Sequence, residues 1–122
     1  MNRDELIAYC LTKTGAFEDT PFGPDTLTIK VMNKLFALTG TEPDAKTVNL
    51  KCDPDHALFL RNVYPDDVKP GYHMNKQHWN TVTLAGAVSD DEIRDMVDES
   101  YDLVVKSLKK ADREALKAMH SE

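Results

Sequence analysis

The chain has 122 residues, of which 41% are hydrophobic and 30% are charged, and its formal net charge is −6 at pH 7. A chain of this length can bury enough surface to fold as one domain without a disulfide framework or a structural metal. The acidic charge argues against indiscriminate binding of nucleic acid, and no apolar run approaches the roughly 20 residues that a membrane-spanning helix requires.

The N-terminus and the cysteines bear on the cellular location of the protein. The first residues lack the basic segment, apolar segment and cleavage site of a secretory signal. Cys10 and Cys52 are too few for a disulfide framework, and cysteines among apolar neighbours usually behave as small hydrophobes. We therefore expect a single cytoplasmic domain over residues 1–122, without a disulfide.

The first 25 residues predict a helix followed by an ordered loop. Apolar residues recur at helical spacing over residues 6–11, and Gly15 can adopt the left-handed conformation that ends a helix. Two prolines and a glycine in residues 19–25 favour an ordered loop, in which we expect Phe22 to be tucked inward.

Two stretches in the middle of the chain alternate apolar and polar residues. Residues 27–31 do so, and a second apolar run over residues 35–38 predicts an antiparallel hairpin in which Asn33 tolerates a positive φ. Residues 47–52 alternate again and predict a third strand. Its apolar face carries Val48, Leu50 and Cys52, and its polar face carries Thr47, Asn49 and Lys51.

The following segment predicts a short helix and two further strands. Asp53 and Pro54 are typical of a helix N-cap and first helical position, and this helix must stop before Pro65. Residues 79–84 are rich in β-branched side chains and alternate, and a lesser strand is expected around Val68.

The last third of the chain is predicted to be helical. Ser89 and Glu92 have the spacing of a capping box, which marks the start of a helix with an apolar stripe along one face. A short terminal helix is expected over residues 112–119. Together the elements predict an α+β domain, an antiparallel sheet with helices packed on one face and its other face free for solvent or a ligand.

Residues 70–81 are the leading candidate site because they combine the single tryptophan, two histidines, amides and a lysine. Aromatic faces stack on planar groups, while amides and lysines hold edges and anions. Residues 26–88 carry seven basic and six acidic side chains, so a basic surface there is compatible with the net charge. The proposed stacking residues are Tyr72 and Trp79, and the proposed anion contacts are Lys51 and Lys76, with Lys30 as a further candidate. The proposed hydrogen-bonding residues are Asn49, His73, Asn75 and His78, and Asn80 is included in the site without a separate role.

The most favoured ligand of this surface is DNA or another nucleic acid. A small planar molecule in a pocket and a protein partner at an exposed sheet edge remain open as alternatives. A purely structural role is also open, in which Tyr72 and Trp79 fill the sheet edge while Asn75 and Asn80 bond the loop backbone. We expect a monomer.

Catalytic and metal-binding chemistry has little support in the sequence. His73 and His78 with His56 or Asp53 match no familiar ligand spacing, and Cys52 with His56 lacks an identifiable third group. Phosphate-loop and dinucleotide-binding fingerprints are absent. We therefore expect no catalytic residue, no metal, no cofactor and no enzymatic activity.

Three motifs in order, residues 21–26, 49–52 and 70–82, resemble the MmcQ/YjbR family of small bacterial proteins. The resemblance spans nearly the whole chain. It implies a fold related to the frataxin-like sandwich, described as a double-wing DNA-binding motif, with the candidate residues above at matching positions. The chain departs from the family at Met32 and Asn33, where relatives tend to have a glycine-rich turn, and at Gln77, where they often have a basic residue.

Overall fold

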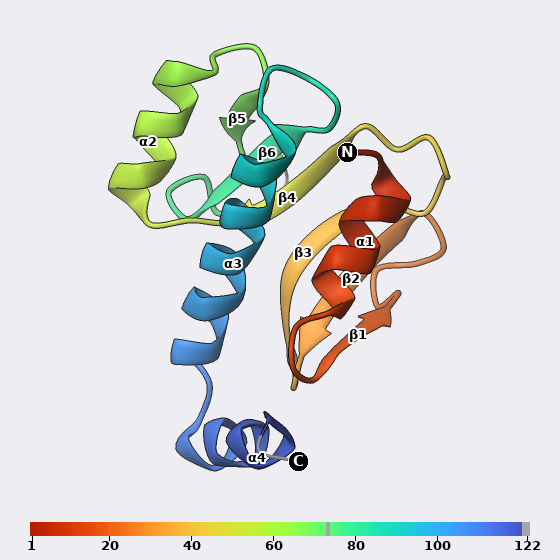
Figure 1. Ribbon diagram of the computed structural model, residues 1–122, viewed down its shortest axis with the longest axis vertical. Coiled ribbons are helices and arrows are strands. Elements are labelled where there is room, and N and C mark those ends of the chain that lie inside the picture. The colour runs from red at the N-terminus through yellow and green to blue at the C-terminus, as the bar shows by residue number, and fades with distance from the viewer. Residues whose placement is uncertain (73, 121–122) are drawn as a thin grey trace.

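Six antiparallel strands form one sheet in the order β1-β2-β3-β4-β6-β5, as seen in a computed structural model that describes residues 1–72 and 74–120 (Figure 1). With its four helices the chain has the α+β architecture predicted from the sequence. The elements are α1 (Arg3–Leu11), β1 (Ala16–Asp19), β2 (Thr26–Val31), β3 (Lys34–Gly40), β4 (Thr47–Lys51), α2 (Pro54–Val63), β5 (Val68–Pro70), β6 (Trp79–Thr83), α3 (Asp90–Lys106) and α4 (Lys110–His120).

The hydrophobic core lies between the sheet and the helices α1 and α3. Its largest fully buried side chains include Leu6 of α1, Phe36 of β3 and Ile93 of α3. The buried hydroxyl of Ser100 donates to the carbonyl of Phe36 at 2.6 Å and accepts from the backbone N–H of Lys51 at 2.9 Å. This hydroxyl therefore joins α3 to β3 and to the last residue of β4. None of the helices that the structure describes is long and apolar enough to cross a bilayer.

The helix starts follow local capping chemistry. Asp53 caps α2 and Pro54 is its first residue, as predicted. Ser89 caps α3 by accepting from the Glu92 N–H at 3.2 Å, but the Glu92 carboxylate also accepts from the Tyr64 hydroxyl. A complete capping box instead opens α1, between Asn2 and Glu5.

Two local expectations were wrong, and one strand was missed. The four-residue strand β1 was not predicted, because its sequence Ala-Phe-Glu-Asp does not alternate. The positive φ of the β2–β3 turn falls on Met32, at 55°, rather than on Asn33. Phe22 is 65% exposed rather than tucked inward, because its loop stands on the side of the sheet that carries no helix.

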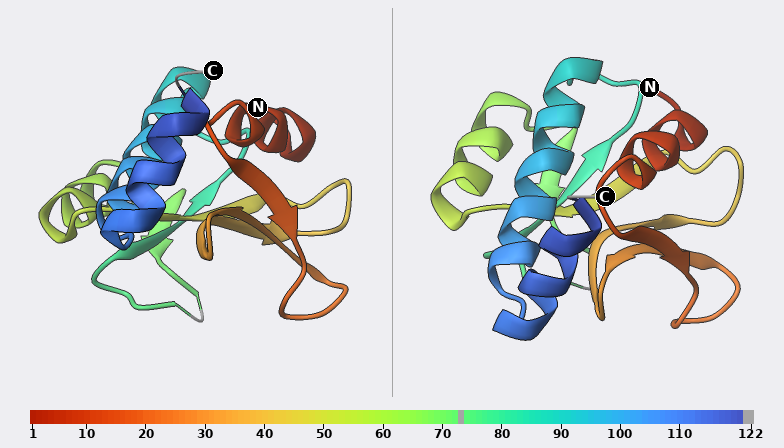
Figure 2. Two further views of the ribbon diagram at one scale, coloured as in Figure 1. Left: turned by 90° about the horizontal axis from the view of Figure 1, so that it is seen from below. Right: turned by 60° about the horizontal axis from the view of Figure 1, so that its bottom comes forward.

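The side of the sheet opposite the helices is called the open face. Strand register places Leu38, Asn49, Thr81 and Lys69 in one row across β3, β4, β6 and β5 on this face. Apart from residue 73, which lies outside the described residues, the loops 20–25 and 71–78 project from the same side and flank the open face (Figure 2, left). Strand residues Leu38 and Asn49 and loop residues Phe22 and Tyr72 line a pocket on this face.

Candidate functional site

A pocket of about 460 Å³ lies on the open face between the two loops. This volume falls within the range of small-molecule sites, which are typically concave and mostly apolar with a few polar groups. Two aromatic rings stand in its walls, Phe22 from one loop and Tyr72 from the other, and they are 65% and 71% exposed. The lining residues are Phe22, Thr26, Leu38, Asn49, Tyr72 and Met74.

Asn49 is the oriented polar group of this pocket. Its Oδ1 accepts from the Thr81 hydroxyl, whose oxygen accepts from the Tyr72 backbone N–H at 3.0 Å. These hydrogen bonds fix the orientation of the amide, because its oxygen is the atom bonded to Thr81. Among the residues that the structure describes, the Asn49 amide nitrogen donates to no protein group, so its N–H groups are available to a ligand.

The loop 71–78 is held in place by Arg61 of α2. The guanidinium donates to the carbonyl oxygens of Lys76 and Trp79, and its Nε donates to Asn80 Oδ1 at 2.8 Å. Within the loop, Asn75 Oδ1 accepts from the Gln77 N–H at 2.9 Å, a bond typical of asparagine in turns. The pocket wall that carries Tyr72 is therefore anchored from the helix side of the sheet.

The structure places the predicted site residues in different parts of the molecule. Asn49 and Tyr72 line the pocket, while Lys51 and Trp79 face each other in register on the open face without lining it. Three more lie in the loop 71–78, and His73 lies outside the described residues. The three loop residues are Asn75, Lys76 and His78.

Asn80 does not belong to the open face, so this part of the prediction was wrong. Strand alternation turns its side chain toward the helices, where it is only 2% exposed and accepts from Arg61. Its Nδ2 is buried with no hydrogen-bond partner among the described residues. A cavity of about 10 Å³, comparable to one water molecule, is lined by Asn80, Cys52 and Glu99.

The apolar lining residues Phe22, Leu38 and Met74 were not predicted. Leu38 and Met74 resemble core residues in sequence, since nothing local shows that their strand face and loop carry no helix. Phe22 had a signal in its Pro-Phe-Gly-Pro context, which predicts an ordered loop but not the direction of the ring.

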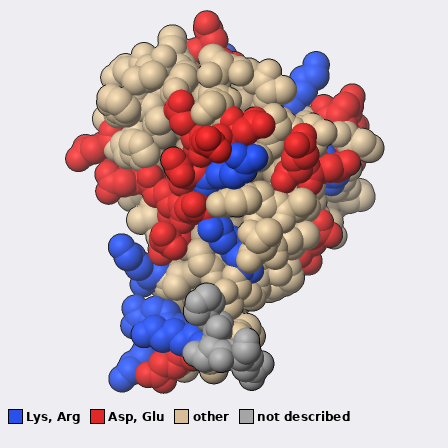
Figure 3. Space-filling view, viewed as in Figure 1, with Lys and Arg blue, Asp and Glu red and all other residues tan. Residues whose placement is uncertain are grey.

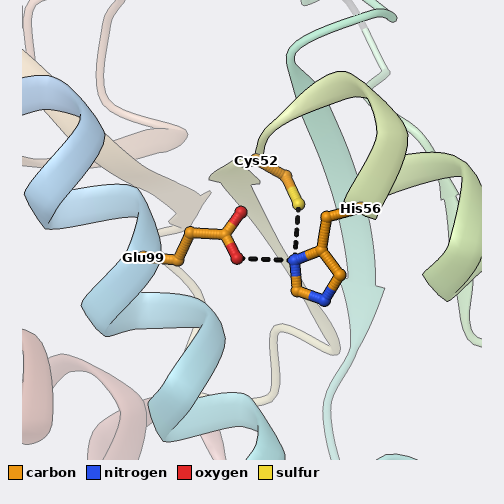
Figure 4. Close-up of side chains that lie close together, drawn as sticks. All are labelled: Cys52, His56 and Glu99. Carbon is orange, nitrogen blue, oxygen red and sulfur yellow. Dashed lines mark hydrogen bonds and ion pairs between the residues drawn. The ribbon is translucent and has the colours of Figure 1, made fainter.

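A second cluster of chemical groups lies on the helix side of the sheet, where Cys52, His56 and Glu99 converge (Figure 4). Cys52 follows β4, His56 lies in the first turn of α2, and Glu99 comes from α3. His56 Nδ1 is 3.5 Å from Cys52 Sγ and 2.5 Å from Glu99 Oε1. Within the described part of the chain, this is the one group of three such donors found within 4.8 Å of one another.

The protonation of Cys52 limits what this cluster can do on its own. Burial, and next the hydrogen bond to Glu99, raises the pKa of the Cys52 thiol well above its ordinary value. A catalytic thiol needs a lowered pKa and a histidine that uses one ring nitrogen for the thiol and the other for the carboxylate. Here both partners contact Nδ1, so the cluster is not arranged as a nucleophile with its base.

An acidic groove of about 240 Å³ between α2 and α3 leads to this cluster. Glu92, Asp95 and Glu99 line it from α3, while His56 and Phe59 line it from α2. On the face covered by the helices, acidic side chains are abundant around α3, and basic side chains gather around α4, with others among the acidic ones in the middle of the face (Figure 3). This field favours cations over anions in the groove.

The fold and the open face define a class of small α+β proteins in which one sheet is covered by helices on one side and flanked by two loops on the other. The chain belongs to the YjbR family, whose model matches residues 11–103. It is 37% identical over 116 residues to the uncharacterized protein YjbR of Escherichia coli K12, covering 95% of this chain and 98% of the relative. The uncharacterized protein YbdF of Escherichia coli O157:H7 is 38% identical over 97 residues, covering 80% of this chain and 79% of the relative.

Solved structures share the fold. The crystal structure of the Deinococcus radiodurans protein DR2400 matches with a TM-score of 0.85 and 37% identity, covering 95% of this chain and 88% of that one. A Pseudomonas syringae protein matches with a TM-score of 0.69 and 28% identity, covering 84% of this chain and 98% of that one. The arrangement of the sheet and helices is therefore one that is known from solved structures of related proteins.

Proposed function

We propose that the protein binds a small planar molecule in the open-face pocket, between the rings of Phe22 and Tyr72. The observation that carries this proposal is the pocket itself, a concavity of about 460 Å³ with two exposed rings in opposite walls and one oriented amide. Exposed aromatic rings that can meet the faces of a planar group gain both buried area and stacking energy on binding.

Polarity and size narrow the ligand class. Leu38 and Met74 add apolar surface, whereas Thr26 and Asn49 offer a hydroxyl and amide N–H groups. A heteroaromatic ring system with a hydrogen-bond acceptor at its edge satisfies both kinds of group. A nucleobase, a nucleotide and an aromatic natural product all belong to this class, and the pocket volume suits one such unit.

Nucleic acid is a second candidate, supported by the charges on the open face. Strand register places Lys30, Lys51 and Lys69 there with one acid, Asp19, which pairs with Lys30 at 2.9 Å. Lys51 and Lys69 form no ion pair with other described residues. The acid-rich helix side shown in Figure 3 lies opposite, so the net charge of −6 is not spread evenly over the molecule.

To test the pocket, the protein is titrated with a panel of nucleotides and uncharged heteroaromatic compounds, and binding is measured by calorimetry. We expect Phe22→Ala and Tyr72→Ala each to weaken binding about tenfold, since an aromatic pair contributes about 0.5–1.5 kcal/mol beyond the area it buries. Both side chains are exposed, so the melting temperature should change little.

Phe59→Ala is the matched control, because Phe59 is 60% exposed but lies on α2 outside the pocket. This variant should bind every compound as the wild type does. An equal loss of affinity in Phe59→Ala, or no binding of any compound by the wild type, would contradict the proposal.

A further inference from the structure

We propose that Cys52, His56 and Glu99 form a binding site for one divalent transition-metal ion of the zinc type. The site lies on the helix side of the sheet, so it is separate from the open-face pocket and does not depend on the function proposed for it. Its three donors come from three different elements, which only the folded chain brings together.

The donor set is the one that such ions prefer. Zinc is bound by thiolate sulfur, imidazole nitrogen and carboxylate oxygen, and sites with three protein ligands leave a fourth position open. A thiolate together with an imidazole selects zinc and its neighbours over magnesium and calcium, which prefer oxygen ligands alone. The cluster thus differs in kind from a group of surface acids.

The distances fit this geometry after one small movement. Tetrahedral zinc places its sulfur and nitrogen ligands about 3.6 Å apart and its nitrogen and oxygen ligands about 3.3 Å apart. Cys52 Sγ and His56 Nδ1 are already 3.5 Å apart, whereas Nδ1 and Glu99 Oε1 are 2.5 Å apart. The Glu99 side chain must therefore withdraw by somewhat less than 1 Å, a change within reach of its rotamers.

The proton balance is simple. In the metal-free protein, hydrogen bonds hold both Cys52 and His56 against Glu99. The metal takes the place of these protons between the three ligand atoms. The thiol of Cys52 loses one proton. The imidazole of His56 stays neutral, with its proton on Nε2, so that Nδ1 is free to bind the metal. Binding of one divalent ion therefore releases one proton in total.

Asn80 supplies an independent observation at the same place. Its side chain is 2% exposed and its Nδ2 has no partner among the described residues, and Asn80 lines the water-sized cavity that Cys52 and Glu99 also line. A buried donor without an acceptor costs about 1–3 kcal/mol. A water or small anion in the open metal position would accept from this nitrogen and complete its hydrogen bonding.

The surroundings favour the arrival of a cation. Glu92 and Asp95 line the groove that leads from solvent to His56 and Glu99. Glu99 is also oriented, because its second oxygen, Oε2, accepts from the Asp53 N–H at 3.0 Å. Partners that orient a metal ligand in this way commonly contribute 10- to 100-fold in affinity.

The experiment is a titration of the tag-free full chain with Co²⁺, which replaces zinc and absorbs in the near ultraviolet when bound by a thiolate. We expect one equivalent to bind, with a thiolate band that zinc reverses. Cys52→Ser should abolish the band. Cys10→Ser is the matched control and should retain it, because Cys10 is also a buried free cysteine but is not part of the cluster. His56→Gln and Glu99→Gln should weaken binding at least tenfold.

The thermal stability of each variant gives a second readout. At one fixed zinc concentration, zinc should raise the melting temperature of the wild type and of Cys10→Ser more than that of His56→Gln, because the stabilisation grows with the affinity of the folded state for its ligand. A thiolate band that survives in Cys52→Ser would overturn the site, as would absence of binding in the wild type. If Cys52→Ser fails to fold, equal zinc stabilisation of wild type and His56→Gln overturns it instead.

Discussion

Arg61 holds three separate groups through its hydrogen bonds. Its guanidinium donates to the carbonyl oxygen of Lys76 in the loop, to that of Trp79 at the start of β6 and to the Oδ1 of Asn80. Since Asn80 Nδ2 has no partner among the described residues, loss of Arg61 would leave both ends of that amide unpaired. The loop 71–78 would lose its anchor at the same time.

We therefore predict that Arg61→Met lowers the free energy of unfolding by about 2–4 kcal/mol, since hydrogen bonds to charged groups contribute about 1.5–3 kcal/mol. Urea denaturation measures this change, and amide hydrogen exchange should rise in residues 71–78. Lys69→Met is the control, because Lys69 is an exposed cation of similar length without an ion pair among the described residues. Similar losses in both variants would show that Arg61 acts only as a surface charge.

Single residues also mark what the sequence could and could not predict. Asn49 and Tyr72 were found because strand alternation and an aromatic-rich loop are local patterns. Glu99 was not found as the partner of His56, because the two are 43 positions apart and meet only when α3 crosses the end of β4. Cys52 and His56 are four positions apart, which was the available local signal, but the third group came from the fold.

At the scale of elements, the docking of α4 depends on a glycine at the far end of the chain. Gly15 has a φ of +74°, and a Cβ there would come within 2.7 Å of Leu116 Cδ1. Leu116 is the buried residue of α4 in the hydrophobic core. The turn after α1 and the last helix therefore share one tightly packed contact.

Gly15→Ala is predicted to destabilise the protein through two effects that can be separated. The left-handed conformation costs a non-glycine residue about 1–2 kcal/mol, and overpacking against Leu116 adds about 1–3 kcal/mol. In a Leu116→Ala background the second effect disappears, so the cost of Gly15→Ala should fall to the first alone. A double-mutant cycle measured by urea denaturation gives this difference, and equal costs in both backgrounds would disprove the contact.

The elements themselves differed in how far the sequence determined them. Side-chain N-caps begin α2 and α3, and β2, β4 and β6 alternate, so these elements were predicted close to their bounds. β1 was missed because its residues are only partly buried or exposed, and pairing with β2 creates the strand. The direction of the loop 20–25 was also beyond local patterns, since it depends on which face the helices cover.

At the scale of the whole molecule, charge is separated between two sides. Acidic side chains of α3 dominate the helix side, and the strands of the open face carry more lysine than acid. Net charge alone therefore gave an incomplete indication of possible partners. The sequence indicated this separation only in part, because residues 26–88 carry nearly equal numbers of basic and acidic side chains. The sheet register is needed to show that Lys51 and Lys69 lie on the same face.

If the open face binds nucleic acid, Lys51→Ala combined with Lys76→Ala should reduce the salt dependence of single-stranded DNA binding. Each lost phosphate contact lowers the slope of log K against log[salt] by about 0.7. The double variant should therefore lose about 1.4 of that slope, without a change in melting temperature. Fluorescence anisotropy of a labelled oligonucleotide measures both affinity and slope.

The matched control is Lys109→Ala with Lys110→Ala, which removes two exposed lysines at the start of α4. It changes the net charge equally but leaves the open face intact. An unchanged slope in the open-face variant, or an equal change in the α4 variant, would remove nucleic acid as a candidate and leave the planar ligand.

Helix α2 touches both candidate sites, which has a thermodynamic consequence. Its first turn carries His56 of the metal cluster, and its last turn carries Arg61, which anchors the wall of the pocket that contains Tyr72. If binding at one site shifts α2, the residues that α2 contributes to the other site shift as well, and the affinity of that site changes. Linkage then makes the effect reciprocal: whatever factor one occupant imposes on the affinity of the second, the second imposes on the first.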